Sequence, residues 1–217
     1  MLRHYWPATA GASDRCWIGH VAWHPDATCV AGAGEDGTVC LWDAADGTLI
    51  GQLTGHRSTI TCVAWSTDGS QLASGSSEGG ELFVWDATGG ERLCALAGHP
   101  RMVNAVAWGA SEDVLISGDD GGTLRWWNIR SGRCIQLREA HQGAIQALRR
   151  SPDRSKLASC GNDGAIRLWD LDTGAYLQTL RHDRPYERMD ISGLGGITPA
   201  QRTSLLALGA VDTISDR

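Results

Sequence analysis

Serine, histidine and acidic residues recur together along this chain, and these side chains supply the nucleophile, base and orienting acid of acyl-transfer enzymes. Three such sets are each followed by a tryptophan: His56, Ser74, Glu78 and Trp85; His99, Ser117, Asp120 and Trp127; His141, Ser159, Asp163 and Trp169. A small hydrolase that uses one Ser-His-Asp set is therefore one hypothesis. An active site normally occurs once, however, and the repetition of this set favours a structural role.

The sets lie within a repeated hairpin pattern, which is clearest at residues 157–170. There a short apolar run meets an Asn-Asp-Gly turn, and an alternating strand then ends in Trp-Asp. Asp-Gly between two such runs predicts a hairpin, because glycine tolerates the positive φ of a primed turn. Earlier copies of the pattern occupy residues 30–43, 72–86 and 115–128.

These hairpins belong to longer units of regular length. The histidines that punctuate the units are His56, His99, His141 and His182, at intervals of 43, 42 and 41 residues. Four strands in about 40–45 residues, with Gly-His and Trp-Asp punctuation, are typical of a propeller blade. Through Gly55-His56, Trp85-Asp86 and their counterparts, residues 13–182 resemble the WD-repeat β-propeller family. The expected fold class is all-β, with four complete four-stranded blades and a short C-terminal α-helix.

The repeat boundaries predict the organisation of the chain. The predicted parts are an N-terminal segment (1–12), four blades (about 13–55, 56–98, 99–140 and 141–182) and a C-terminal tail (183–217). The tail offers a short strand within 186–193 and a helix over 199–208, because Thr198 and Gln201 form a capping box around Pro199. The WD-repeat resemblance implies that the histidine, serine, acid and tryptophan of a blade form a buried hydrogen-bond network. The first blade carries Gly32 where the others carry serine, so its network is expected to be the weakest.

The tail is also similar to the tails of bacterial STAND-type signalling ATPases, in which the propeller is the sensor. This similarity rests on residues 185–193 and 198–211. It implies that the chain is the C-terminal part of a bacterial signalling protein. The sequence contains no Gly-x-x-x-x-Gly-Lys-Ser/Thr phosphate loop, so an ATPase part would lie outside this chain.

Ring closure is the main question that four blades leave open. A closed ring removes exposed sheet edges and buries the face of each blade against its neighbour. Three arrangements fit the sequence: an open four-blade arc, a fragment of a longer propeller, or two chains that close an eight-bladed ring. We favour an arc that is either a truncated C-terminal piece or is completed by self-association.

Composition narrows the class of partner. Lys and Arg number 19 against 25 Asp and Glu, and the resulting charge of −6 argues against nucleic acid as a partner.

No apolar run approaches the roughly 20 residues that span a bilayer, and the first residues lack a signal peptide, which favours the cytoplasm. The seven cysteines and seven histidines show no metal-ligand spacing, and no cofactor is expected.

The WD-repeat resemblance implies where partners would bind. In that family, contacts often come from the third and fifth residues after the histidine and from the residue before the turn aspartate. Carried over to this chain, the candidate partner-binding residues are Trp17, Glu35, Thr59, Ser77, Met102, Asn104, Asp119, Gln146 and Asn162. Apolar anchors among small polar and acidic groups suit a protein or peptide partner.

The sequence therefore favours a non-catalytic scaffold or sensor module that binds proteins. The alternative is the small hydrolase, in which one serine would be a nucleophile and the other two would be structural.

Overall fold

The computed structural model describes residues 17–181 and 189–212. The chain forms two compact units, Met1–Leu180 and Arg181–Arg217, and each is described by itself. The predicted N-terminal segment 1–12 lies outside the described residues. In the part of the chain that is described, no helix has the length and apolar character needed to cross a membrane.

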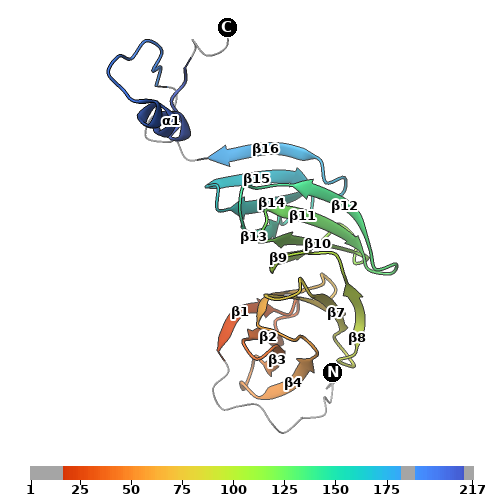
Figure 1. The fold of residues 1–217 in the computed structure, drawn as a ribbon. Coiled ribbons are helices and arrows are strands. Elements are labelled where there is room, and N and C mark those ends of the chain that lie inside the picture. Colours follow the sequence, from red (N-terminus) through yellow and green to blue (C-terminus); the bar gives the residue numbers. More distant parts are fainter. Residues whose placement is uncertain (1–16, 182–188, 213–217) are drawn as a thin grey trace. The chain divides into compact units, whose positions relative to one another are not determined.

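The first unit contains four antiparallel sheets of four strands, here called blades 1 to 4, which follow one another in chain order (Figure 1). Blade 1 contains β1 (Ile18–Trp23), β2 (Cys29–Gly34), β3 (Thr38–Asp43) and β4 (Leu49–Thr54). Blade 2 contains β5 (Ile60–Trp65), β6 (Gln71–Ser76), β7 (Leu82–Asp86) and β8 (Arg92–Leu96). Blade 3 contains β9 (Val103–Trp108), β10 (Val114–Asp119), β11 (Thr123–Asn128) and β12 (Arg133–Glu139). Blade 4 contains β13 (Ile145–Arg150), β14 (Lys156–Gly161), β15 (Ala165–Asp170) and β16 (Tyr176–Arg181).

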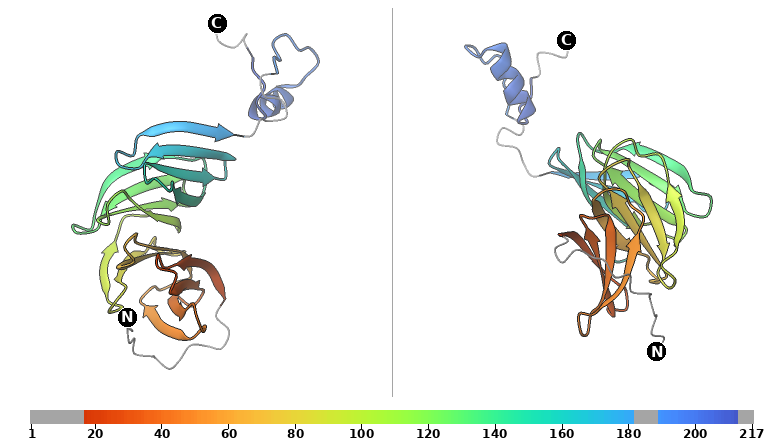
Figure 2. Two further views of the ribbon diagram at one scale, coloured as in Figure 1. Left: turned by 180° about the vertical axis from the view of Figure 1, so that it is seen from behind. Right: turned by 60° about the horizontal axis from the view of Figure 1, so that its bottom comes forward.

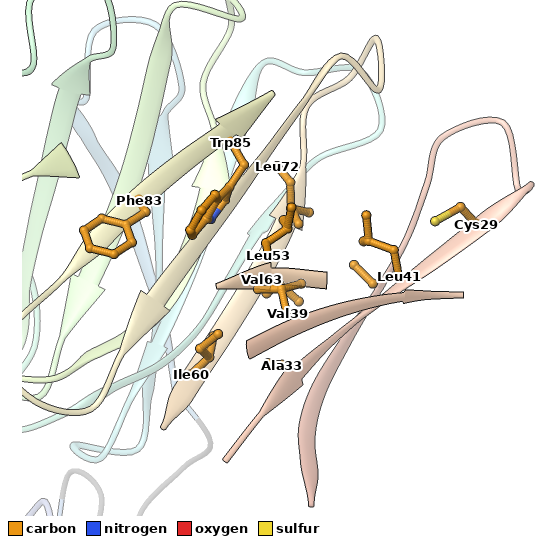
Figure 3. Packing of buried hydrophobic residues seen from close by; sticks show 11 residues of the cluster. Cys29, Ala33, Val39, Leu41, Leu53, Ile60, Val63, Leu72, Phe83 and Trp85 are labelled. Atoms are coloured by element: carbon orange, nitrogen blue, oxygen red, sulfur yellow. The ribbon is translucent and has the colours of Figure 1, made fainter. Parts of the chain in front are cut away.

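Apolar residues at alternate strand positions pack neighbouring blades face to face. Between blades 1 and 2, Val39 and Leu41 meet Val63, Leu72 and Trp85 (Figure 3). Two further clusters of the same kind join blade 2 to blade 3 and blade 3 to blade 4. Burial of this apolar surface is the main favourable term for stacking the sheets.

The blades do not close into a ring. The first strands contact one another in the order β1, β5, β9 and β13, and among the described residues no strand pairing joins blade 1 to blade 4 (Figure 2). The prediction of four four-stranded blades in an open arrangement, with a short C-terminal helix, is confirmed.

The second unit contains that helix, α1 (Pro199–Ala207). Thr198 accepts from the backbone N–H of Gln201 at its N-cap, and the Gln201 side chain accepts from the Thr198 backbone, which completes the predicted capping box. Leu208 is the C-cap of the helix, and the helix has no buried residue. Part of the predicted strand lies outside the described residues, and Asp190 forms an isolated parallel bridge with Val211.

In each hairpin turn between the second and third strands of a blade, the glycine nearest the third strand has a positive φ; in blade 2 the preceding Gly79 has a positive φ as well. The glycines nearest the third strands are Gly37, Gly80, Gly122 and Gly164, with φ of 80°, 58°, 84° and 68°. A Cβ atom on the first three would lie 2.8, 2.2 and 2.0 Å from the carbonyl oxygens of His56, His99 and His141. A Cβ atom on Gly164 would meet no atom within 4 Å. Three of the turns therefore press against the backbone of the next blade, and the fourth faces open space.

Gly122→Ala should destabilise the protein more than Gly164→Ala. Both alanines would adopt a positive φ, which costs about 1–2 kcal/mol, but only the first meets a carbonyl oxygen. We expect Gly122→Ala to lower the free energy of unfolding by a further 1–3 kcal/mol or so, as overpacking does. Urea unfolding followed by tryptophan fluorescence measures both variants, and equal losses would contradict the blade contact described here.

Candidate functional site

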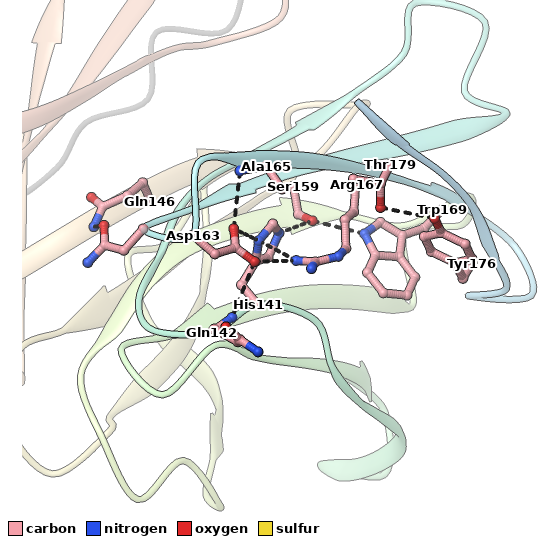
Figure 4. Close-up of polar contacts among 11 residues, drawn as sticks. His141, Gln142, Gln146, Ser159, Asp163, Ala165, Arg167, Trp169, Tyr176 and Thr179 are labelled. Carbon is pink, nitrogen blue, oxygen red and sulfur yellow. Dashed lines mark hydrogen bonds and ion pairs between the residues drawn. The ribbon is translucent and has the colours of Figure 1, made fainter. Parts of the chain in front are cut away.

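A buried chain of hydrogen bonds crosses blade 4 (Figure 4). The indole Nε1 of Trp169 donates to Ser159 Oγ at 2.9 Å, and Ser159 Oγ lies 2.8 Å from His141 Nε2. His141 Nδ1 lies 2.9 Å from a carboxylate oxygen of Asp163. The tryptophan comes from β15, the serine from β14 and the histidine from the segment before β13, so the chain of bonds ties three parts of the blade together.

The donors and acceptors fix the direction of these bonds. An indole N–H can only donate, so the serine oxygen accepts from Trp169 and its own proton is free to go to His141 Nε2. The histidine then carries its proton on Nδ1 and donates it to Asp163. We assign this tautomer because it gives the serine, the histidine and the carboxylate a partner each; Arg167 Nη1, which also lies 2.7 Å from His141 Nδ1, then donates to Asp163.

Blades 2 and 3 repeat the arrangement. The tryptophan-to-serine distances are 2.7 Å for both Trp85–Ser74 and Trp127–Ser117, and the serine-to-histidine distances are 2.7 Å for Ser74–His56 and 2.6 Å for Ser117–His99. All three serines are fully buried. We call each set of histidine, serine, tryptophan and acid the His–Ser–Trp network of its blade.

The acid of blade 3 is Asp119, and the prediction of Asp120 is wrong. Asp119 Oδ2 lies 3.0 Å from His99 Nδ1, while Asp119 Oδ1 accepts from the backbone N–H groups of Gly121 and Thr123. Asp119 ends β10 and is buried, so it is also wrong as a candidate partner-binding residue. Asp120 follows in the turn, where its backbone N–H donates to Met102 O at 3.0 Å.

The acid of blade 2 is Glu81, and the prediction of Glu78 is wrong. Glu81 Oε2 lies 3.2 Å from His56 Nδ1 and accepts from the backbone N–H of Arg57. Between the paired residues Gly75 and Leu82, this turn has one residue more than its counterparts. The extra residue leaves the Glu78 side chain exposed, and the longer reach of a glutamate brings Glu81 back to the histidine.

The residue paired with the serine on the third strand differs between blades. In blades 3 and 4 it is an arginine: Arg125 donates to Asp119 and Arg167 donates to Asp163, both at 2.8 Å. In blade 2 it is Phe83, whose ring stacks on His56 with 4.2 Å between centroids. The two arginines were not among the predicted network residues; their place opposite the serine is the signal that could have found them.

Burial and hydrogen bonding shift the pKa values of the network. Burial lowers the pKa of His56 and His99 below the ordinary 6.5. Burial alone would raise the pKa of Asp119, but hydrogen bonds from His99, the Thr123 backbone and Arg125 outweigh it and lower the pKa from 3.8 to about 2. The pKa of Asp163 is likewise lowered, because hydrogen bonds from His141 and Arg167 outweigh the effect of burial. At neutral pH each of these two acids is a carboxylate, and His99 is a neutral imidazole.

Blade 1 lacks the serine. Gly32 lies where the serines stand, and a Cβ atom there would lie 2.5 Å from the Trp42 ring. The indole of Trp42 therefore occupies the space that a serine side chain would need. The prediction that this blade carries the weakest network rests on the same residue.

The candidate partner-binding residues follow the hairpin turns and the segments before the first strands. In each blade a backbone N–H of the hairpin turn donates to a backbone carbonyl of the segment before the first strand. These bonds run from Glu35 to Trp17, Ser77 to Thr59, Asp120 to Met102 and Asn162 to Ala144, at 3.0, 2.9, 3.0 and 3.0 Å. The pairing shows that Asp120, not Asp119, occupies the turn position in blade 3. Trp17, Glu35, Gln146 and Asn162 are exposed, and Thr59, Ser77, Met102 and Asn104 are half-buried. We call these residues, with Asp120 in place of Asp119, the rim.

Two rim residues also face the first strands of other blades. Asn104 and Gln146 line a cavity of about 150 Å³ together with His20 and Arg149. Gln146 Nε2 donates to Asn162 Oδ1 at 2.9 Å, which connects this cavity to the turn of blade 4. Within the described residues, no group of three or more His, Cys, Asp and Glu side chains could hold a metal ion.

Comparisons with known proteins match the repeats. The family model described as "WD domain, G-beta repeat" matches residues 90–128 and 132–170, and the model "IFT140 first beta-propeller" matches residues 9–99. Intraflagellar transport protein 122 homologs are 42% identical over 62 residues in Danio rerio and 38% identical over 63 residues in Homo sapiens. These alignments cover 28% and 29% of this chain and 5% of each relative.

A ciliary WD repeat-containing protein, ctxp80 of Euplotoides octocarinatus, is 33% identical over 58 residues, which cover 27% of this chain and 8% of the relative. This chain thus aligns with only a small part of the curated relatives it matches, and these relatives are eukaryotic. The matches do not support the resemblance of the tail to bacterial STAND-type ATPases.

Asp119→Asn should destabilise the protein and Asp120→Asn should not. The first change removes the charge that pairs with Arg125 inside the blade, and breaking a buried pair costs about 3 kcal/mol. The second alters a half-buried turn residue, with an expected effect within about 0.5 kcal/mol. Chemical denaturation measures the free energy of unfolding of both variants. A larger loss for Asp120→Asn than for Asp119→Asn would show that Asp120 is the network acid.

The free energy of unfolding should fall as the pH is lowered through about 6.5, the ordinary pKa of histidine. Because the pKa of His99 is lowered in the folded protein, the unfolded chain binds more protons below about pH 6.5, and protonation favours unfolding. Asp119 adds a second loss between pH 3.8 and about 2. Denaturation at several pH values measures both, and His99→Gln should reduce the first loss, to which His56 also contributes. An unchanged slope in that variant would contradict the assignment.

Proposed function

We propose, from the premise that residues 90–128 and 132–170 are WD repeats, that the chain is a non-catalytic scaffold that binds proteins or peptides. The observation that carries this proposal is the state of the three serines. Each Oγ is fully buried and bonds to a tryptophan on one side and a histidine on the other. A serine held in this way has no access to a substrate, whereas a nucleophile must meet one.

The rim is the surface proposed to bind the partner. Trp17 presents a large exposed apolar group, and half-buried Met102 lies beside the turn residue Asp120. Tryptophan is prominent among residues that dominate binding energy, and polar residues around it can satisfy a peptide backbone. The net charge of −6 supports a protein partner over nucleic acid. A membrane is not proposed as a partner.

The cytoplasm is the proposed location. Among the described residues, Cys29, Cys62, Cys94, Cys134 and Cys160 are free thiols. Cys29, Cys40 and Cys62 are buried, and Cys94 and Cys160 are partly buried. Free thiols are usual in a reducing compartment, whereas secreted proteins commonly pair their cysteines.

A narrower proposal is that the chain is the C-terminal part of a bacterial signalling protein. It is supported by the sequence of residues 185–193 and 198–211, and the eukaryotic relatives speak against it. A gene for a signalling ATPase directly upstream would support it, and a eukaryotic source would exclude it.

Peptides selected for binding to this protein should depend on the rim. We expect Trp17→Ala to weaken such peptides tenfold or more, in the range of a binding hot spot, because the indole is the largest exposed group of the rim. Isothermal titration calorimetry measures the affinities. Ile135→Ala is the matched control, since Ile135 is an exposed apolar residue of the outer strand β12 and lies outside the rim.

The hydrolase alternative has its own test. Ser74→Ala, Ser117→Ala and Ser159→Ala should each lower the melting temperature and change no ester hydrolysis. A variant that abolishes a measured hydrolysis while it keeps its melting temperature would refute the scaffold.

A further inference from the structure

We propose that two copies of this chain associate head to tail, with the open face of blade 1 of one copy against the open face of blade 4 of the other. Two such contacts would close a ring of eight blades. The proposal concerns the flat faces of the end blades and does not depend on the rim.

The open face of blade 4 carries apolar residues at the positions where the other blades pack against the next blade. Val39, Leu82 and Leu124 pair with the second strand at the same register in blades 1, 2 and 3, and each is 0% exposed because the next blade covers it. Ile166 has this register in blade 4 and is 43% exposed. Gly164 in the same blade faces open space, where the other turn glycines meet the next histidine.

The open face of blade 1 is the other half of the same contact. Val63, Val106 and Leu148 occupy one register on the first strands of blades 2, 3 and 4, and they are 2%, 6% and 1% exposed because they pack on the preceding blade. Val21 has this register in blade 1 and is 58% exposed. At this register the side chain is buried in blades 2, 3 and 4, whereas that of Val21 is exposed to water.

A hydrogen bond between blades gives the two faces polar complementarity. Trp65 Nε1 donates to the carbonyl of Ala22 in blade 1 at 3.2 Å, and Trp108 Nε1 donates to the carbonyl of Ala64 in blade 2 at 2.9 Å. Trp23 has the same position in blade 1, and its side chain is exposed. Among the described residues its indole N–H makes no hydrogen bond. The matching carbonyl on the open face of blade 4 belongs to Arg149, which has the register of Ala22 and Ala64.

A second copy is the occupant that these observations favour, because one chain carries both halves of the contact. Head-to-tail contacts make a closed ring when the rotation completes a circle. Eight blades lie within the range of four to eight that propellers adopt, and three copies would exceed it. Arg149 replaces the alanines of the internal contacts, and its guanidinium opposite Trp23 is suited to a cation–π contact.

Light scattering on the full chain tests the proposal. The wild type should have twice the 23.2 kDa chain mass. Val21→Glu and Ile166→Glu each place a charge on one of the two faces, and both should be monomeric. Because both residues are exposed in the single chain, these variants should keep the circular dichroism spectrum and melting behaviour of a folded monomer. Ile135→Glu is the control, with a comparable apolar residue 59% exposed on β12, and should stay dimeric.

Mixing the two monomeric variants separates a head-to-tail contact from a symmetric one. Val21→Glu keeps an intact blade 4 face and Ile166→Glu keeps an intact blade 1 face, so the mixture should regain dimers that neither variant forms alone. A monomeric wild type, or one whose association both variants leave unchanged, would overturn the proposal, as further blades of a longer chain would then be the occupant. Loss of association in only one variant would also overturn it, because it would indicate a symmetric contact.

Discussion

The hydroxyl group of one buried serine in each of blades 2, 3 and 4 is the interaction on which those blades depend. It accepts from a tryptophan on the third strand and donates to a histidine that precedes the first strand. Because all these groups are buried, the loss of one member leaves the others without a partner, which costs about 1–3 kcal/mol for each polar group. The network therefore fixes the second strand, the third strand and the segment before the first strand of a blade relative to one another. It also explains why a serine, a histidine and an acid lie within hydrogen-bonding distance of one another in three successive blades, with each serine fully buried.

The acid is the member of the network whose backbone position varies. What must be satisfied is the Nδ1–H of the histidine, and any carboxylate that reaches it will serve. Asp119 reaches it from the end of a strand, Asp163 from a turn and Glu81 from beyond a longer turn. In blade 2 the opposite residue is Phe83, which stacks on His56 where the other blades place an arginine. The network is thus conserved in its hydrogen bonds and varied in its surroundings.

The same repetition separates two kinds of surface. Around the networks, the turns and the segments before the first strands form the rim, where residues differ from blade to blade and are available to a partner. On the flat faces most registers carry apolar residues in every blade, with Arg149 as an exception, since they belong to one contact repeated three times. On the outer faces of blades 1 and 4, at the two ends of the series, the same kind of residue is exposed instead of packed against a neighbouring blade. Partner binding and self-association can therefore occur on different surfaces of one chain.

The sequence by itself determined the four blades, the hairpins and the histidine, serine and tryptophan of each network, because period, turn glycines and strand alternation are local signals. It also predicted the capping box of α1, which involves residues three apart. It misplaced two acids, because strand pairing and turn length decide which carboxylate reaches a histidine some 20 residues away. The exposure of Val21 and Ile166 was decided only by the tertiary structure. Both residues have the apolar character of their buried counterparts, and only the absence of a neighbouring blade leaves them in water.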